Sequence, residues 1–238
     1  MRIKKIKRIL WVLTGFLVLT VLGTAGCGMK KDYAIKKMLA YMKSKYGEEF
    51  IYVETYAGQY GSSYIMILVK SSDNPERTAL VRISEREGRR RYEDNYLARL
   101  RKKELEQRIG DLARKCFGEC KTYYKLPDFV FPTWFKADMS AEEFLKSPYA
   151  MAQFYIYPAA AEGSREEWEI KMEEFRSANA QEGYQVRGTL SLCQTEKDYE
   201  MISERTFVSS DYEGYQARDE LTFSMDKNGS FRYIRWME

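Results

Sequence analysis

Three β-type segments follow one another early in the chain, with only short turns between them. Residues 50–56, 64–69 and 78–83 are rich in aromatic and β-branched side chains. The segments that join them, AGQYGSS and SSDNPE, consist largely of turn-forming residues. Connections this short favour antiparallel pairing of consecutive strands, and the continuous apolar run at 64–69 favours a central position for that strand. The sequence therefore predicts a three-stranded antiparallel meander.

Helical segments flank this meander. Asp32 is suited to cap a helix that runs to Tyr46, with apolar residues spaced three or four apart along one face. A long, highly charged helix is predicted over residues 92–115. A further strand over 121–126 is expected to return to the same sheet. The first unit is thus predicted as α-β-β-β-α-β, covering residues 32–126.

A second unit is predicted after a connector that is rich in proline and aromatic residues. The connector, residues 127–138, reads PDFVFPTWFKAD and is taken as the domain boundary. In the second unit, residues 139–238, two S-x-x-E capping boxes open helices at Ser140 and Ser164. Strand-like segments alternate with these helices. The predicted fold class is therefore α+β, with two small units that each have a mainly antiparallel sheet covered by helices.

The C-terminus carries a clear hairpin pattern. Residues 221–225 and 231–236 are β-type segments, and Asn228-Gly229 between them suits a two-residue turn. Counting outward from that turn pairs Phe223 with Ile234 and places Leu221 opposite Trp236.

The first 28 residues have the three-part pattern of a secretory signal. A basic segment is followed by an apolar stretch over residues 9–22 and then by the small residues 23–26, directly before Cys27. The apolar stretch is shorter than the ~20 residues that a membrane-spanning helix needs. The basic residues of the segment are Arg2, Lys4, Lys5, Lys7 and Arg8.

The segment Thr24-Ala25-Gly26-Cys27 resembles the lipobox of bacterial lipoproteins. In that family a lipid is attached to the cysteine thiol and the signal is cut directly before it. The family usually has Leu where this chain has Thr24. The resemblance implies a signal peptide over 1–26, cleavage between Gly26 and Cys27, and a lipidated tether over 27–31. The protein would then lie on the extracytoplasmic face of the cell membrane.

Two other interpretations of the N-terminus remain open at this point: an uncleaved membrane anchor, and a signal that is cut without lipidation. The resemblance covers only this segment, and the body of the chain resembles no characterised family.

Cleavage at this position changes the charge of the protein. The whole chain has 39 basic and 35 acidic residues, and five basic residues but no acidic ones precede Cys27. The mature chain therefore has 34 basic and 35 acidic residues, a net charge of −1. Nucleic-acid binding requires a basic surface excess, so the composition argues against a nucleic-acid partner.

The chain contains no histidine. This excludes Ser-His-Asp and Cys-His catalysis and metal sites with histidine ligands, and no cofactor motif is present, so we expect neither a metal nor a cofactor. Adjacent glutamates at 142–143, 166–167 and 173–174 fit helix caps and solvated helix faces better than catalytic pairs. An S-x-x-K match at Ser224 and an S-D-N match at Ser72 resemble elements of penicillin-recognising enzymes, but their order is reversed and K-T-G is missing.

Two groups of residues are candidate binding surfaces. The first is an aromatic group in and before the connector that would line a ligand groove between the units, unless it packs as a domain interface. The second is a basic group before the long helix that would contact an anionic surface, unless it is a solvated loop. The aromatic group consists of Tyr124, Phe131, Trp134 and Phe135, and the basic group of Arg86, Arg89, Arg90 and Arg91.

Three cysteines remain after Cys27 is assigned to the lipid. Cys116 and Cys120 are close enough in sequence to form a disulfide, whereas the alternative is three buried thiols, with Cys193 as the third.

Together these features predict a membrane-anchored, extracytoplasmic, non-enzymatic binding or interaction protein of the cell envelope. Its partners would be the membrane itself, through the lipid, and an envelope protein, a peptide or a wall polymer. The alternative is an envelope hydrolase or transferase that uses carboxylate, Tyr or Lys chemistry in a groove between the units.

Replacing Cys27 by Ser removes the thiol that would carry the lipid. We expect Cys27→Ser to abolish labelling with a radioactive fatty acid and to release or mislocalise the protein. Wild-type protein that carries no lipid and is still retained in the membrane would refute the anchor.

Overall fold

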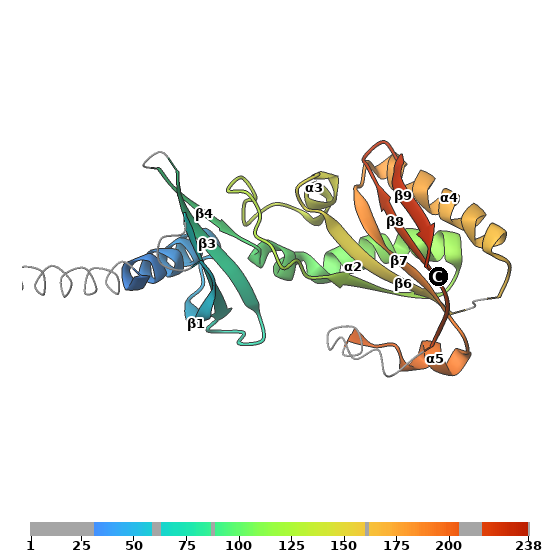
Figure 1. The fold of residues 1–238 in the computed structure, drawn as a ribbon, viewed down its shortest axis with the longest axis horizontal. Coiled ribbons are helices and arrows are strands. Elements are labelled where there is room, and N and C mark those ends of the chain that lie inside the picture. Colours follow the sequence, from blue (N-terminus) through green and yellow to red (C-terminus); the bar gives the residue numbers. More distant parts are fainter. Residues whose placement is uncertain (1–30, 59–62, 87–88, 160–161, 205–215, 238) are drawn as a thin grey trace, which may run out of the picture. The chain divides into compact units, whose positions relative to one another are not determined.

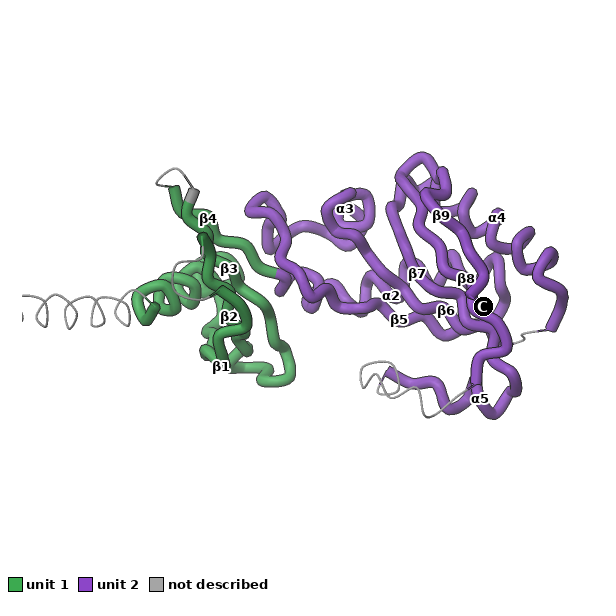
Figure 2. Tube along the Cα trace, in the orientation of Figure 1, with its two compact units in different colours: residues 1–94 green, residues 95–238 purple. Residues whose placement is uncertain are grey.

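The computed structural model describes residues 31–58, 63–86, 89–159, 162–204 and 216–237. The chain forms two compact units, which meet in sequence between Asp94 and Asn95 (Figures 1 and 2). Each unit has a mainly antiparallel sheet with helices, which confirms the predicted α+β class.

Unit 1 consists of a helix and a four-stranded antiparallel sheet in the order β1-β2-β3-β4. The helix covers residues 31–46 and ends at Gly47, whose φ of 76° is the left-handed conformation favoured at a helix C-terminus. The predicted meander is present, and β2 is an interior strand as expected. The strands are β1 (Phe50–Ala57), β2 (Tyr64–Ser71), β3 (Thr78–Arg86) and β4 (Arg89–Asp94).

One face of this sheet forms the core of unit 1. Ile67 and Val69 of β2 and Val81 of β3 are completely buried, as are Met38 and Met42 of the helix. Because side chains alternate along a strand, the apolar run of β2 buries only every second residue, and the other face of the strand is partly exposed.

A buried carboxylate joins the helix to β4. Asp94 is 1% exposed and accepts hydrogen bonds from Tyr41 Oη (2.8 Å), Lys45 Nζ (2.6 Å) and Tyr46 Oη (2.5 Å). The Tyr41 ring stacks on Tyr92, two residues before Asp94, with ring centroids 5.3 Å apart. Burial, followed by the negative charge of Asp94, raises the pKa of Tyr41.

The fourth strand of this sheet corrects the sequence prediction. Residues 89–94 form β4 and pair with β3, whereas the sequence predicted a loop leading into a helix from residue 92. The strand predicted over 121–126 does not return to this sheet, because it pairs with a strand of unit 2. The boundary therefore lies at 94/95 and not in the connector 127–138. Five of the six residues of β4 are charged, so this segment lacks most of the aromatic and β-branched residues that usually indicate a strand.

Unit 2 contains a five-stranded sheet in the order β5-β6-β7-β8-β9. Strands β6 and β7 are parallel and are connected through α4, and every other pairing is antiparallel. The strands are β5 (Cys120–Lys125), β6 (Ala152–Pro158), β7 (Val186–Cys193), β8 (Ala217–Met225) and β9 (Phe231–Trp236). The helices are α2 (Tyr96–Phe117), α3 (Ala141–Lys146), α4 (Arg165–Glu182) and α5 (Glu196–Met201).

The core of unit 2 lies between the sheet and the helices α2, α3 and α4 (Figure 1). Phe117 of α2 and Phe223 of β8 both contact Phe175 of α4, with ring centroids 5.2 and 6.0 Å apart. Gly188 of β7 faces this core, and a Cβ there would lie 2.1 Å from the carbonyl oxygen of Phe154, so only glycine fits.

Local sequence signals that were predicted to start helices and turns are confirmed in unit 2. Both capping boxes form, at Ser140 before α3 and at Ser164 before α4, and a third at Thr195 opens α5. The predicted register of the final hairpin is also confirmed, with Phe223 opposite Ile234 and Leu221 opposite Trp236. Near the turn a bulge shifts the pairing to Met225 with Phe231, so the connection is longer than two residues.

Asp94→Ala should destabilise unit 1 strongly, because it leaves three buried or half-buried donors without their acceptor. We expect a loss of about 3 kcal/mol in the free energy of unfolding, the usual cost of breaking a buried charged network. Urea denaturation followed by circular dichroism measures this loss. Glu85→Ala, which removes an exposed partner of Arg90, is the control and should change little. Equal stability of the two variants would contradict the role given to Asp94.

Candidate functional site

Three of the four residues predicted to line an aromatic groove form part of the core of unit 2. Tyr124, Phe131 and Phe135 are at most 1% exposed. Phe131 and Phe135 stack at 4.8 Å, and the edges of both meet Phe144 of α3. Burial raises the pKa of Tyr124. The groove prediction is therefore wrong for these three residues, because their rings are buried in the core beside the apolar face of the sheet.

Trp134, the fourth residue of that group, lies on the surface. Its side chain is 54% exposed, and its ring meets the Tyr149 ring edge to face at 5.2 Å. Tyr149 is equally exposed. A turn produces this arrangement, because the amide of Phe135 donates to the carbonyl of Pro132 at 3.0 Å and points the intervening residues outward. Large exposed aromatic residues that contact each other are typical of binding surfaces.

A strained residue follows this aromatic pair. Met151 has a φ of 46°, and it is the non-glycine residue with positive φ in the described part of the chain. Its side chain is 48% exposed and comes two residues after Tyr149. An unbranched side chain in this conformation costs free energy, and such residues often occur at functional positions. Trp134, Tyr149 and Met151 are together called the Trp134 surface below.

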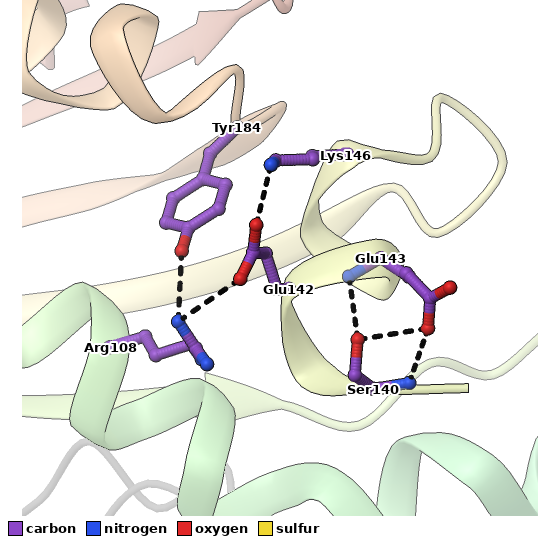
Figure 3. Close-up of polar contacts among 6 residues, drawn as sticks. All are labelled: Arg108, Ser140, Glu142, Glu143, Lys146 and Tyr184. Carbon is purple, nitrogen blue, oxygen red and sulfur yellow. Dashed lines mark hydrogen bonds and ion pairs between the residues drawn. The ribbon is translucent and has the colours of Figure 1, made fainter. Parts of the chain in front are cut away.

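A group of polar contacts fixes α3, the helix between Trp134 and Tyr149 (Figure 3). Arg108 of α2 donates to Tyr184 Oη at 3.3 Å and forms an ion pair with Glu142 of α3 at 3.8 Å. Lys146, one turn after Glu142, donates to the same carboxylate at 2.6 Å. This hydrogen bond lowers the pKa of Glu142. The Glu142–Arg108 ion pair links α3 to α2, and Arg108 in turn contacts Tyr184 before β7.

The neighbouring acidic residues have structural roles too. Glu143 accepts from the backbone and hydroxyl of Ser140 at 2.9 Å each, which lowers the pKa of its carboxyl group (Figure 3). The other two glutamate pairs contribute a cap through Glu167 and an ion pair between Glu173 and Arg176. These contacts agree with the interpretation of all three pairs as caps and solvated residues.

The basic group lies on the β3–β4 hairpin. Arg86 pairs with Arg89 across the hairpin, and Arg89, Arg90 and Arg91 are exposed. These residues are strand residues, so the interpretation as a solvated loop is corrected. The Arg90 guanidinium lies 5.5 Å from the centre of the Tyr33 ring in the first helix and 3.4 Å from Glu85. Hydrogen bonds with Tyr33 and Glu85 raise the pKa of Arg90.

The cysteines show no disulfide among the described residues. Cys116, Cys120 and Cys193 are free thiols, and Cys120 and Cys193 are buried. Burial raises the pKa of all three, to about 11 for Cys193, so they are poor nucleophiles near neutral pH. Gly26 and Cys27, the predicted cleavage and lipidation site, lie outside the described residues.

Two exposed tyrosines escaped the sequence analysis although the sequence contains signals for them. Tyr149 follows Ser147-Pro148, a pair typical of an exposed turn. Tyr33 lies beside the apolar stripe of its helix, which indicates a solvent-facing aromatic residue. The conformation of Met151 has no sequence signal, because methionine is not a turn-forming residue.

The residues that the structure describes contain no group of three or more Cys, Asp or Glu side chains able to hold a metal ion. Within the same ranges, no helix is long and apolar enough to cross a membrane. The two elements of the S-x-x-K and S-D-N match belong to different units, with Ser224 in β8 and Ser72 after β2.

Comparison with known proteins identifies a similar solved structure. No family model matches the chain, and no curated protein matches it. A crystal structure of a DUF5037 family protein from Ruminococcus gnavus ATCC 29149 is similar, with a TM-score of 0.41 and 16% sequence identity. The alignment covers 83% of this chain and 93% of the other.

Replacing two adjacent residues separates the roles of core and surface. Phe135→Ala empties a completely buried position and should lower the free energy of unfolding by about 3–5 kcal/mol. Trp134→Ala removes an exposed ring and should change it by less than about 1 kcal/mol. Urea denaturation of both variants checks this contrast. A large loss for Trp134→Ala would mean that this ring is a packing residue and not part of a binding surface.

Proposed function

We propose that this protein is a lipid-anchored, extracytoplasmic lipoprotein that acts in the cell envelope by binding and not by catalysis. The Trp134 surface is the observation that carries this proposal. It combines two exposed aromatic rings that contact each other with Met151, a residue of positive φ two positions after Tyr149 in the sequence. Trp and Tyr are among the residues that most often supply binding energy at interfaces.

The way this surface is held supports a binding role. Leu145 and Lys146 at the end of α3 accept hydrogen bonds from Gln185, through its backbone at 2.8 Å and its side chain at 2.9 Å. Before α3, the carbonyl of Met139 accepts from Arg101 Nε at 2.9 Å. A backbone that is already ordered loses little conformational entropy on binding, which favours affinity.

The charged residues also favour binding over catalysis. Among the described residues, Asp94 is the one acidic or basic residue that is buried, and three hydrogen bonds from unit 1 already satisfy it. A general acid or base needs access to its substrate, and Asp94 is enclosed by these donors. Glu143 and Glu167 serve as helix caps, and Glu142 and Glu173 are ion-pair partners.

The anchor rests on the lipobox-like segment that ends at Cys27. The first described residue, Lys31, follows only four positions later and already belongs to a helix. The partner would be another envelope protein, a peptide or a wall polymer.

In-cell photo-crosslinking tests the binding role directly. A benzophenone amino acid at Met151 should form adducts with a partner in intact cells, and Trp134→Ala should reduce their yield by about tenfold or more. Ile170→Ala is the matched control, because Ile170 is an exposed apolar residue of α4 on the same unit and should leave the yield unchanged. Equal yields from the Trp134→Ala variant and the parent protein would refute this surface as the binding site.

A further inference from the structure

The first described turn of the N-terminal helix and strand β4 meet at Tyr33. The Tyr33 ring lies 5.5 Å from the Arg90 guanidinium and 5.4 Å from Lys37 Nζ, one helical turn away. Tyr33 is 49% exposed, and Arg89 and Arg91 on either side of Arg90 are exposed as well. Two segments that are more than fifty residues apart in sequence thus form one basic and aromatic surface of unit 1, which we call the Tyr33 surface.

This surface is positively charged although the mature protein is not. Residues 31–37, Glu85 and residues 89–91 contain six basic and two acidic residues, whereas the mature chain has a net charge of −1. One of these acids, Glu85, pairs with Arg90, and the other, Asp32, lies in the first described turn of the helix. Positive charge is therefore concentrated here and is balanced elsewhere in the chain.

The position of Cys27 in the sequence places this surface near the anchor. Four residues of fully extended chain span at most about 14 Å, so Lys31 cannot be farther than that from Cys27 whatever path the chain takes. Tyr33 adds two residues of helix, or about 3 Å. If Cys27 carries a lipid, the Tyr33 surface is within reach of the headgroup layer.

We propose that the Tyr33 surface contacts anionic phospholipid headgroups and so holds unit 1 against the membrane. This inference rests on the proposed lipid anchor. Arginine forms paired hydrogen bonds with phosphate, a tyrosine ring suits the boundary between headgroups and acyl chains, and each basic residue near an anionic surface strengthens the contact by about fivefold. The lipid supplies attachment, and the Tyr33 surface restricts the orientation of unit 1.

The test uses the full lipidated protein in vesicles. One set of vesicles is pure phosphatidylcholine, and the other contains three parts in ten of phosphatidylglycerol. Phenylglyoxal modifies accessible arginines, and mass spectrometry reads each site. We expect modification of Arg89, Arg90 and Arg91 to slow by about fivefold or more in the anionic vesicles, and 0.5 M salt to remove the difference. Arg165 and Arg218 of unit 2 are exposed internal controls and should react equally in both sets.

Two double variants test whether the protection of Arg90 depends on this surface or on the total charge of the protein. Arg89→Gln with Arg91→Gln should weaken the protection of Arg90 in anionic vesicles, whereas Lys103→Gln with Lys227→Gln, the same change of charge at exposed sites of unit 2, should not. Equal loss in both double variants would overturn the proposal.

The outcomes also distinguish the surface from the anchor. Lipid on Cys27 together with equal arginine modification in the two vesicle sets would overturn the headgroup contact and leave the anchor intact. A protein without lipid on Cys27 would instead overturn the proposed function.

Discussion

Burial of one face of the five-stranded sheet organises unit 2. The helices α2, α3 and α4 cover that face, and aromatic rings from the helices, the strands and the connector fill the space between them. This demand for apolar volume explains why Phe131 and Phe135 are in the core and are not free to bind a ligand. It also explains why Trp134 is notable, since it lies in sequence between the buried rings of Phe131 and Phe135 and remains on the surface where the turn directs it outward.

Unit 1 also buries one face of its sheet, but it does so with fewer residues. Its helix covers a small sheet whose edge strand β4 is almost entirely charged, and Asp94 links the two through three hydrogen bonds. Cross-strand ion pairs between Arg82 and Glu93 and between Glu85 and Arg90 compensate part of the remaining charge. The pairing of β4 with β3 also brings Arg90 close to Tyr33. The packing of this edge strand therefore produces the basic surface as well.

The two surfaces proposed here belong to different units and differ in chemistry. The Tyr33 surface is basic and close in sequence to Cys27, which suits a membrane contact. The Trp134 surface is aromatic and uncharged, and the chain on either side of α3 forms it, where Gln185 and Arg101 donate hydrogen bonds to the backbone. A division of this kind would leave one unit to position the protein and the other to bind.

Local signals in the sequence were sufficient for much of this fold. Capping boxes at Ser140 and Ser164, the meander of β1 to β3 and the register of the final hairpin follow from interactions between residues close in sequence, and all are confirmed. The lipobox-like segment and the absence of histidine are also read from the sequence alone, and the signal peptide that this segment predicts stays a prediction.

Only the tertiary structure decided which sheet each strand joins and which aromatic rings are buried. Strand β5 pairs with β6 and not with unit 1, and β4 is a strand in spite of its charges, because pairing depends on partners that are distant in sequence. Phe135 and Trp134 have similar hydrophobicity, yet one is buried and the other exposed. The direction of a side chain at a turn depends on the backbone that its neighbours impose, and no local pattern specifies that.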